Sequence, residues 1–94
     1  MSQPAEAGPL ITLTIRTVEG ETWTDKFNTH ETVKSVVQRA LAHFGIQPAP
    51  GVTYHLLYEG RVLDDNKTLE QEGVKDGSTL LLGTEAQVGW ALVE

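Results

Sequence analysis

Residues 56–69, LLYEGRVLDDNKTL, carry the most specific indication of the fold of this chain. This stretch continues an apolar and aromatic run that begins at residue 52 and is typical of a β-strand, because β-branched and aromatic side chains pack well on a pleated surface. Glu59-Gly60 supplies a turn, and residues 61–63 return as a second, short strand. The charged and polar run at 64–67 then ends that strand with turn-forming residues. The stretch therefore predicts a small β-hairpin.

Upstream of this hairpin, residues 33–44 carry a helical signal. Apolar side chains recur three and four positions apart, which places them on one stripe of an α-helix. They are Val33, Val36, Val37, Ala40, Leu41 and Phe44. Thr32 can cap the first turn through its hydroxyl, and Gly45 can take the left-handed conformation just past the last turn. Because Pro48 and Pro50 prevent continuation, we predict an amphipathic helix over residues 33–44.

The N-terminal part of the chain predicts a longer hairpin. Residues 10–16 alternate apolar and polar side chains, which is the two-residue period of a strand with one buried face. Residues 17–21 contain a glycine and suit a turn, and residues 22–27 resume a strand-like composition. Asp25 falls between two aromatic residues on what should be a single face, so we expect either a bulge or an exposed edge there.

Downstream, the folded part ends with one helical turn and a last strand. Residues 68–73 suit a single turn of helix, and residues 78–82 have the composition of a strand. The order ββαββ, a short helix and a final strand predicts an α+β domain, with one amphipathic helix covering one face of a small mixed sheet. We place this domain at residues 10–83, between a disordered leader at 1–9 and a flexible tail at 84–94.

Length and charge limit what the domain can bind. The 94 residues leave room for one core, and 7 basic against 13 acidic side chains give a net charge of −6, which repels the phosphates of nucleic acids. The composition is close to that of soluble domains and indicates no membrane span. We therefore expect a monomeric, cytoplasmic protein that binds neither nucleic acid nor membranes.

The residue pattern argues against catalysis and metal binding. The chain has no cysteine, which excludes disulfides, thiolate zinc sites and cysteine nucleophiles. His30, His43 and His55 lack the spacing of metal ligands, and no Ser or Thr lies in a nucleophile elbow. Asp64-Asp65 suits a solvated turn better than a catalytic pair. We expect no catalytic residue, no metal and no cofactor.

Residues 56–69 and 73–80 resemble the ubiquitin-like proteins position by position. The shared features are an aromatic residue followed by x-Gly-Arg-x-Leu, an acidic turn, Lys-Thr-Leu, and Ser-Thr-Leu at the start of the last strand. The resemblance covers residues 10–83 and implies the ubiquitin-like β-grasp fold. The matched apolar positions predict the core, which comprises Leu13, Ile15, Phe27, Val33, Val36, Ala40, Leu56, Leu63, Leu69, Val74, Leu80 and Leu82.

The resemblance also implies an apolar, protein-binding patch on the exposed side of the sheet, at Val18, Leu57, Leu81 and Gly83. The pattern supports this on its own, because neighbouring residues of a strand face opposite sides of the sheet. One member of each run of consecutive leucines must therefore leave the core. The simpler alternative is that scattered exposed leucines are ordinary and carry no function.

The tail departs from conjugated ubiquitin-like modifiers, which end in Gly-Gly. This chain has a single Gly89, followed by Trp90 and four more residues. We hypothesise that a peptidase cleaves after Gly89 and that the freed carboxylate is activated and transferred to an amine of a target protein. The partners would be processing, activating (adenylating) and conjugating enzymes. A Val-Gly terminus resembles bacterial ubiquitin-like modifiers, which implies a bacterial ubiquitination-like pathway, with defence as one candidate role.

Other readings of the tail stay open. Val88, Trp90 and Leu92 alternate along it, so it could be a permanent strand or an apolar anchor. The chain would then be a non-conjugated β-grasp adaptor, a small complex subunit that binds through its sheet face, or a detached domain of a larger protein. Arg61 stands where ubiquitin carries its commonly used chain-forming lysine, which argues against polymers linked at that position.

Overall fold

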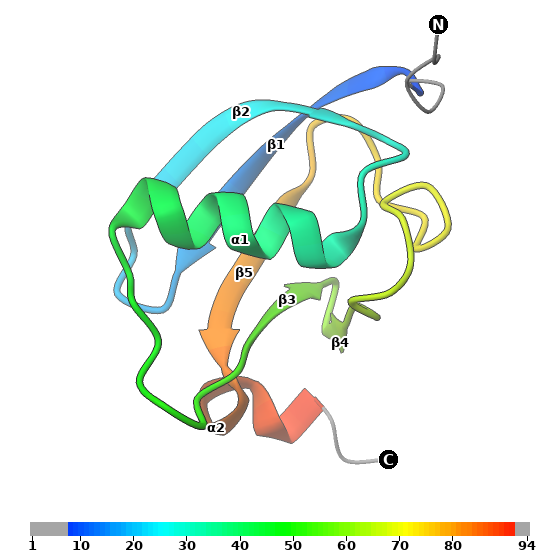
Figure 1. Ribbon diagram of the computed structural model, residues 1–94. Coiled ribbons are helices and arrows are strands. Elements are labelled where there is room, and N and C mark those ends of the chain that lie inside the picture. Colours follow the sequence, from blue (N-terminus) through cyan, green and yellow to red (C-terminus); the bar gives the residue numbers. More distant parts are fainter. Residues whose placement is uncertain (1–7, 92–94) are drawn as a thin grey trace, which may run out of the picture.

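A mixed five-stranded sheet with one long helix across one face forms the body of the molecule (Figure 1). The computed structural model describes residues 8–91. The elements are β1 (Leu10–Thr17), β2 (Thr22–Asn28), α1 (Val33–Phe44), β3 (Tyr54–Tyr58), β4 (Arg61–Val62), β5 (Thr79–Thr84), α2 (Glu85–Val88) and a 3-10 turn at Gly89–Ala91. The strand order is β2-β1-β5-β3-β4, in which only β1 and β5 are parallel among the described strands. The predicted α+β architecture is confirmed.

The first hairpin pairs without a bulge. β1 and β2 run in continuous antiparallel register, with Leu13 opposite Asp25. β2 is an edge strand of the sheet, so the side chain of Asp25 reaches solvent even though its partner is in the core. Of the two expectations for this position, the exposed edge is therefore correct and the bulge is wrong.

α1 begins and ends where the sequence predicts. At its start the Thr32 hydroxyl accepts a 3.2 Å hydrogen bond from the Ser35 N–H. At its end Gly45 has a φ of 69°, and its N–H donates to the Ala42 carbonyl. The left-handed residue closes the last turn, as a C-terminal glycine commonly does.

The core lies between α1 and the sheet. Every residue that the sequence predicts for the core is buried, and all of them belong to one cluster. Ile11, Val37 and Tyr58 extend that cluster. The apolar residues of the strands recur every two positions and those of α1 every three or four. Both patterns arise because these residues face the same interior.

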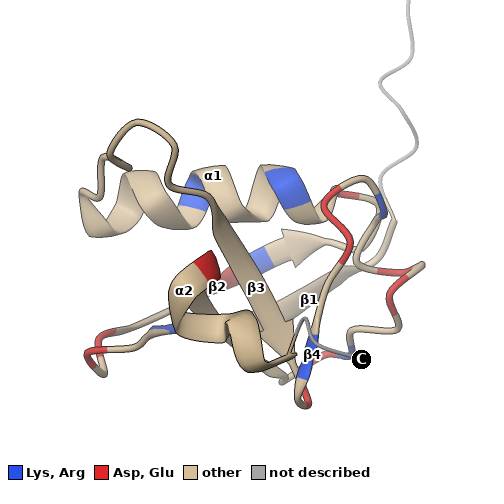
Figure 2. Ribbon diagram, turned by 90° about the horizontal axis from the view of Figure 1, so that it is seen from below, with Lys and Arg blue, Asp and Glu red and all other residues tan. Residues whose placement is uncertain are grey.

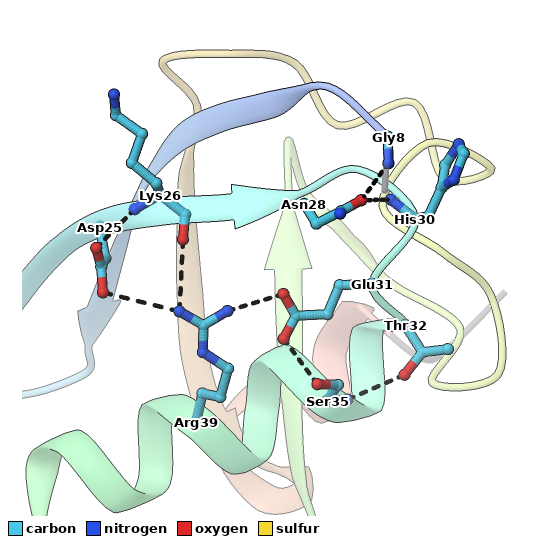
Figure 3. A network of polar contacts seen from close by, with 9 residues as sticks. All are labelled: Gly8, Asp25, Lys26, Asn28, His30, Glu31, Thr32, Ser35 and Arg39. Carbon is cyan, nitrogen blue, oxygen red and sulfur yellow. Dashed lines mark hydrogen bonds and ion pairs between the residues drawn. The ribbon is translucent and has the colours of Figure 1, made fainter. Parts of the chain in front are cut away.

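Polar contacts of Arg39 tie α1 to β2 (Figure 3). Its guanidinium donates to the Glu31 carboxylate at 2.8 Å, lies 3.7 Å from the Asp25 carboxylate, and donates to the Lys26 carbonyl at 3.4 Å. The same group lies over the ring of Phe27, 4.4 Å from the ring centroid. A charged side chain therefore covers part of the open strand edge, where unpaired backbone groups would otherwise invite another strand.

Residues 68–73 form hydrogen-bonded turns. The Glu72 N–H donates to the Thr68 carbonyl at 3.0 Å, which is a bond of helical spacing, and the Gly73 N–H donates to the Glu70 carbonyl at 3.0 Å. The sequence predicts a single helical turn here, and the structure has one hydrogen bond of helical spacing, from Glu72 to Thr68. The turns lead into β5 and complete the ββαββ, turn and strand order.

The first described residues are held to the domain. The Gly8 N–H donates to the side-chain oxygen of Asn28 at 2.8 Å (Figure 3). The Pro9 carbonyl accepts from the Thr29 N–H at 3.0 Å. The expectation of a disordered leader is therefore wrong for residues 8 and 9, because Asn28 at the end of β2 and Thr29 just after it supply hydrogen-bond partners. Residues 1–7 lie outside the described part of the chain.

Candidate protein-binding site

Two leucines lie side by side on the sheet face opposite α1, which we call the outer face. Leu57 on β3 is directly opposite Leu81 on β5. Their neighbours Leu56 and Leu82 are paired in turn and belong to the core cluster. Arg16 on β1 flanks Leu81 from the other side. The structure thus places one member of each leucine run on the outer face, as the alternation of strand side chains requires.

The four residues predicted for the patch differ in their access to solvent. Val18, just past the end of β1, is 49% exposed, and Leu81 is half-buried. Leu57 is only 7% exposed. Gly83, which lies opposite His55, is buried. The sequence predicts an exposed patch, whereas the structure leaves Val18 and Leu81 accessible and covers the other two positions.

The short helix α2 covers Gly83. Its last residue, Val88, is fully buried although it lies outside the main core cluster. A Cβ atom placed on Gly83 would come within 3.0 Å of Val88 Cγ1 and 3.5 Å of Gln87 Cβ. Gly83 alternates with the core residue Leu82, so Val88 packs on the outer face. Figure 2 shows α2 alongside β3 and apart from α1.

A capping box fixes the start of α2. The Thr84 hydroxyl accepts from the Gln87 N–H at 3.2 Å, and the Gln87 side-chain oxygen accepts from the Thr84 N–H at 2.8 Å. The Glu85 N–H donates to the Thr53 carbonyl at 3.0 Å and joins α2 to the segment before β3. Residues 84–87 match the Thr-x-x-Gln signature of such a box, a signal by which α2 could have been predicted.

The expectation of a flexible tail is wrong for residues 84–91. These residues complete β5 and then form α2 and the 3-10 turn, because the capping box and the burial of Val88 favour the folded arrangement. The expected strand is also absent from residues 85–91, and Val88 is an apolar anchor within the chain itself. Gly89 has helical backbone angles, with φ −57° and ψ −29°, and Trp90 is 63% exposed. Residues 92–94, including Leu92, lie outside the described residues.

An open hollow of about 480 Å³ borders the outer face near β4. Its lining includes His55, Arg61, Val62, Asp65, Glu72 and Ala91. His55 Nε2 and Asp65 Oδ1 are buried without a hydrogen-bond partner. Within residues 8–91, no three His, Asp or Glu side chains are grouped so that they could hold a metal ion. The same range contains no helix of the length and apolar character needed to cross a membrane.

Arg61 and Glu72 brace one wall of this hollow. The Arg61 guanidinium donates to the Glu72 carboxylate at 2.7 Å and to the Glu72 backbone carbonyl. The Asp64 N–H donates to the same carboxylate at 2.7 Å. Burial alone would raise the pKa of Glu72, but hydrogen bonds from Arg61 and Asp64, with the charges of Arg61 and Lys67, outweigh it and lower that pKa. Arg61 therefore serves a structural ion pair.

Comparison with known proteins defines the class of this protein. The profile of the ubiquitin family matches residues 13–87. The chain belongs to the ubiquitin family, and its fold is the ubiquitin-like β-grasp. The chicken (Gallus gallus) ubiquitin-associated domain-containing protein 1 is 32% identical in an alignment of 82 residues, and the match covers 81% of this chain and 20% of that protein. The chain thus spans about a fifth of the length of this curated relative.

Solved ubiquitin-like structures superpose on this fold. A de novo designed protein based on ubiquitin is 28% identical with a TM-score of 0.69, and the match covers 82% of this chain and 90% of the designed one. The UBL domain of Plasmodium falciparum Dsk2 is 24% identical with a TM-score of 0.70, covering 81% of this chain and 99% of that domain. The second likeness, at this identity, establishes the fold alone.

Proposed function

We propose that this chain is a ubiquitin-like domain that binds partner proteins through its outer face and is not conjugated to them. The observation that carries the proposal is the pairing of Leu57 with Leu81, two apolar side chains directly opposite each other. Apart from the exposed Leu10 at the far end of β1, the outer face on β1 and β2 is polar, with Thr14 opposite Thr24 and Arg16 at the flank. Leu81 is the accessible member of the pair, and an accessible apolar side chain within a polar surface is suited to contact with a partner.

The fold of the C-terminal residues favours binding over conjugation. Activation of a glycyl carboxylate requires a terminus that can extend into an enzyme's active site. Gly89 instead directly follows Val88, which is fully buried. Extending the segment would break the capping box at Thr84, and a peptidase would require the same release, because proteolysis occurs in exposed and flexible segments. Non-covalent binding requires no such cleavage or activation.

The test uses the ubiquitin-associated domain of the chicken relative as the probe, because that relative matches this chain and is named for such a domain. The full chain is titrated with this probe by calorimetry, and Leu81→Ala is compared with Leu10→Ala. Leu10 is the matched control, since it is a leucine at the far end of β1 and 64% exposed. We expect about tenfold weaker binding for Leu81→Ala, which corresponds to about 1.4 kcal/mol, and unchanged binding for Leu10→Ala. Equal affinity of the two variants, or no binding by the unaltered chain, contradicts the proposal.

Conjugation is the second candidate function, and the accessibility of the Gly89–Trp90 bond favours it. Trp90 is largely exposed, and a Cβ atom placed on Gly89 would meet nothing within 4 Å. A peptidase would hydrolyse this bond, an adenylating enzyme would activate the Gly89 carboxylate with ATP, and a conjugating enzyme would pass it to an amine of a target protein. Such a bacterial ubiquitination-like pathway belongs in the cytoplasm, where ATP is available.

Intact mass tests the second candidate. The chain is co-expressed with its genomic neighbours, and its mass is measured. Loss of residues 90–94, or heavier adducts that Gly89→Ala abolishes, supports conjugation. An unaltered mass in every context rejects it and leaves non-covalent binding.

A further inference from the structure

The proposed binding face is already occupied by part of the chain. Leu57 lies opposite Leu81, and His55 lies opposite Gly83, so these four positions form one block on the outer face. Val88 of α2 is seated on the Gly83 corner of that block. A second side chain cannot enter the space above Gly83 while Val88 fills it, since a single added Cβ atom would already come within 3.0 Å of Val88 Cγ1.

We infer that α2 is a cover that competes in cis with the partner for the outer face, and that the contact of Val88 with Gly83 is its latch. The inference rests on the proposed function and adds its regulation. The partner that fits is a helix presenting a small branched apolar side chain, because that is what α2 itself places on the glycine. Binding then requires α2 to leave the block or be displaced from it.

The cover can open without disturbing the core. Strand pairing between β3 and β5 extends to Tyr54 opposite Thr84 and is complete before α2 begins. The capping bonds between Thr84 and Gln87 lie within the segment itself, and Val88 is the one buried residue of α2. A helix of four residues is too short to be stable in water by itself, so α2 depends on the contact of Val88 with Gly83.

One feature of the covered state favours opening. His55, the partner of Gly83 in the sheet, has a buried Nε2 atom without a hydrogen-bond partner. A polar atom buried in this way loses its bonds to water and gains none in return. Exposing the block would return that nitrogen to water, which offsets part of the loss of apolar contact at Val88.

The expected effect follows from the open fraction of molecules. A partner that binds only the open state has an apparent dissociation constant equal to its intrinsic value divided by the open fraction. A chain that is open about one time in ten therefore binds roughly tenfold more weakly than one held open. Removing the contact of Val88 with Gly83 should therefore strengthen binding of the partner. A variant that only removed contact area with the partner would weaken binding.

The experiment compares Val88→Asp with Ala86→Asp in the full chain. Both variants add one negative charge to α2, but Val88 is buried on Gly83 and Ala86 is exposed. Hydrogen exchange of the Gln87 N–H, which bonds the Thr84 hydroxyl when α2 is formed, reports release of the cover without any partner. Titration with the ubiquitin-associated domain of the chicken relative then measures affinity. Slow exchange of amides in α1 verifies that each variant stays folded. If these amides are not protected in Val88→Asp, Val88→Ala is used in its place.

We expect Val88→Asp to speed exchange at Gln87 and to bind the probe at least about threefold more tightly, with Ala86→Asp like the unaltered chain on both measures. Faster exchange with unchanged or weaker binding overturns the inference but leaves the proposed function intact. Unaltered exchange overturns it as well, because Val88 would then not be the latch. If the unaltered chain does not bind the probe, the proposed function fails and the inference fails with it.

Discussion

Helices α1 and α2 lie on opposite faces of the sheet and begin in the same way, yet they are held very differently. Each starts at a threonine whose hydroxyl accepts a backbone N–H three residues on, Thr32 from Ser35 and Thr84 from Gln87. α1 continues for 12 residues and buries Val33, Val36, Val37 and Ala40. α2 continues for 4 residues and buries only Val88. A cap fixes where a helix begins, whereas the apolar area behind it decides whether the helix is permanent.

Polar contacts also attach α1 to the rest of the domain more extensively than α2. Arg39 connects α1 to the Asp25 carboxylate and the Lys26 carbonyl of β2 (Figure 3). It also lies over the ring of Phe27. α2 has one backbone bond to the preceding part of the chain, from Glu85 to Thr53, besides its own capping bonds. The face that holds α1 therefore stabilises the fold, and the face that holds α2 is suited to exchanging one occupant for another.

The largest expected effect separates the two faces at adjacent residues of β5. Leu80 is fully buried in the core, and Leu81 points to the outer face. We expect Leu80→Ala to lower the free energy of unfolding by about 2–5 kcal/mol, because it leaves a cavity in packed surroundings. Leu81→Ala should cost less than about 1 kcal/mol. Urea unfolding of both variants measures the difference, and equal losses would show that the outer face stabilises the fold as strongly as the core.

Long elements could be predicted from the sequence because several of their residues are buried at a regular spacing. The helix over residues 33–44 shows several apolar residues on one stripe, and its start and end have recognisable caps. Alternation predicted that one member of each leucine run leaves the core, and the resemblance to ubiquitin-like proteins identified Leu57 and Leu81 as those members. Alternation could not predict that Gly83 is covered, because that depends on α2, which folds back after β5.

α2 was missed because it is too short to show a period. The alternation of Val88, Trp90 and Leu92 favours a strand, but a four-residue helix contains a single buried position and no repeat. Two local signals were nevertheless present. Residues 84–87 carry the capping-box pattern, and Gly83 interrupts an apolar strand, which is typical of close approach by another segment.

A double-mutant cycle at the seat of α2 has the next largest expected effect. Gly83→Ala alone should favour opening of α2 by about 1 kcal/mol, because the new Cβ atom would lie 3.0 Å from Val88 Cγ1. In a Val88→Ala background the same change should cost almost nothing, since the opposing methyl is gone. Hydrogen exchange at the Gln87 amide measures the opening free energy in each variant, and the coupling between the two sites should be about 1 kcal/mol.

The matched control for this cycle is the α1 face. Exchange of amides in the middle of α1, such as that of Val37, should be the same in all four chains, because the core does not include Val88. Additive effects of the two changes would mean that Val88 does not rest on Gly83. The contrast between a permanent and an exchangeable helix would then lose its structural basis.

The smallest expected effect is a pH dependence at the wall of the hollow beside the outer face. Glu72 is 10% exposed, and its contacts with Arg61 and Asp64 lower its pKa below the ordinary value of 4.5. A carboxyl group whose pKa is lower in the folded state stabilises the fold above its unfolded pKa, and this contribution is lost as the pH falls through the folded value.

Glu72→Gln should therefore lower the free energy of unfolding by about 0.5–1 kcal/mol at pH 7, a modest figure because the Arg61 partner is 51% exposed. The gap between the variant and the unaltered chain should narrow steadily as the pH falls below about 4.5, since protonation of Glu72 removes the same charge. Urea unfolding at a series of pH values measures the gap. Hydrogen exchange at the Gln87 amide should not change with this stability gap. Glu72 contacts β4 and the turn that follows β4 rather than α2. An exchange rate at Gln87 that rises with the protonation of Glu72 would show that the wall of the hollow helps to hold α2, and the cover would then depend on more than the contact of Val88 with Gly83.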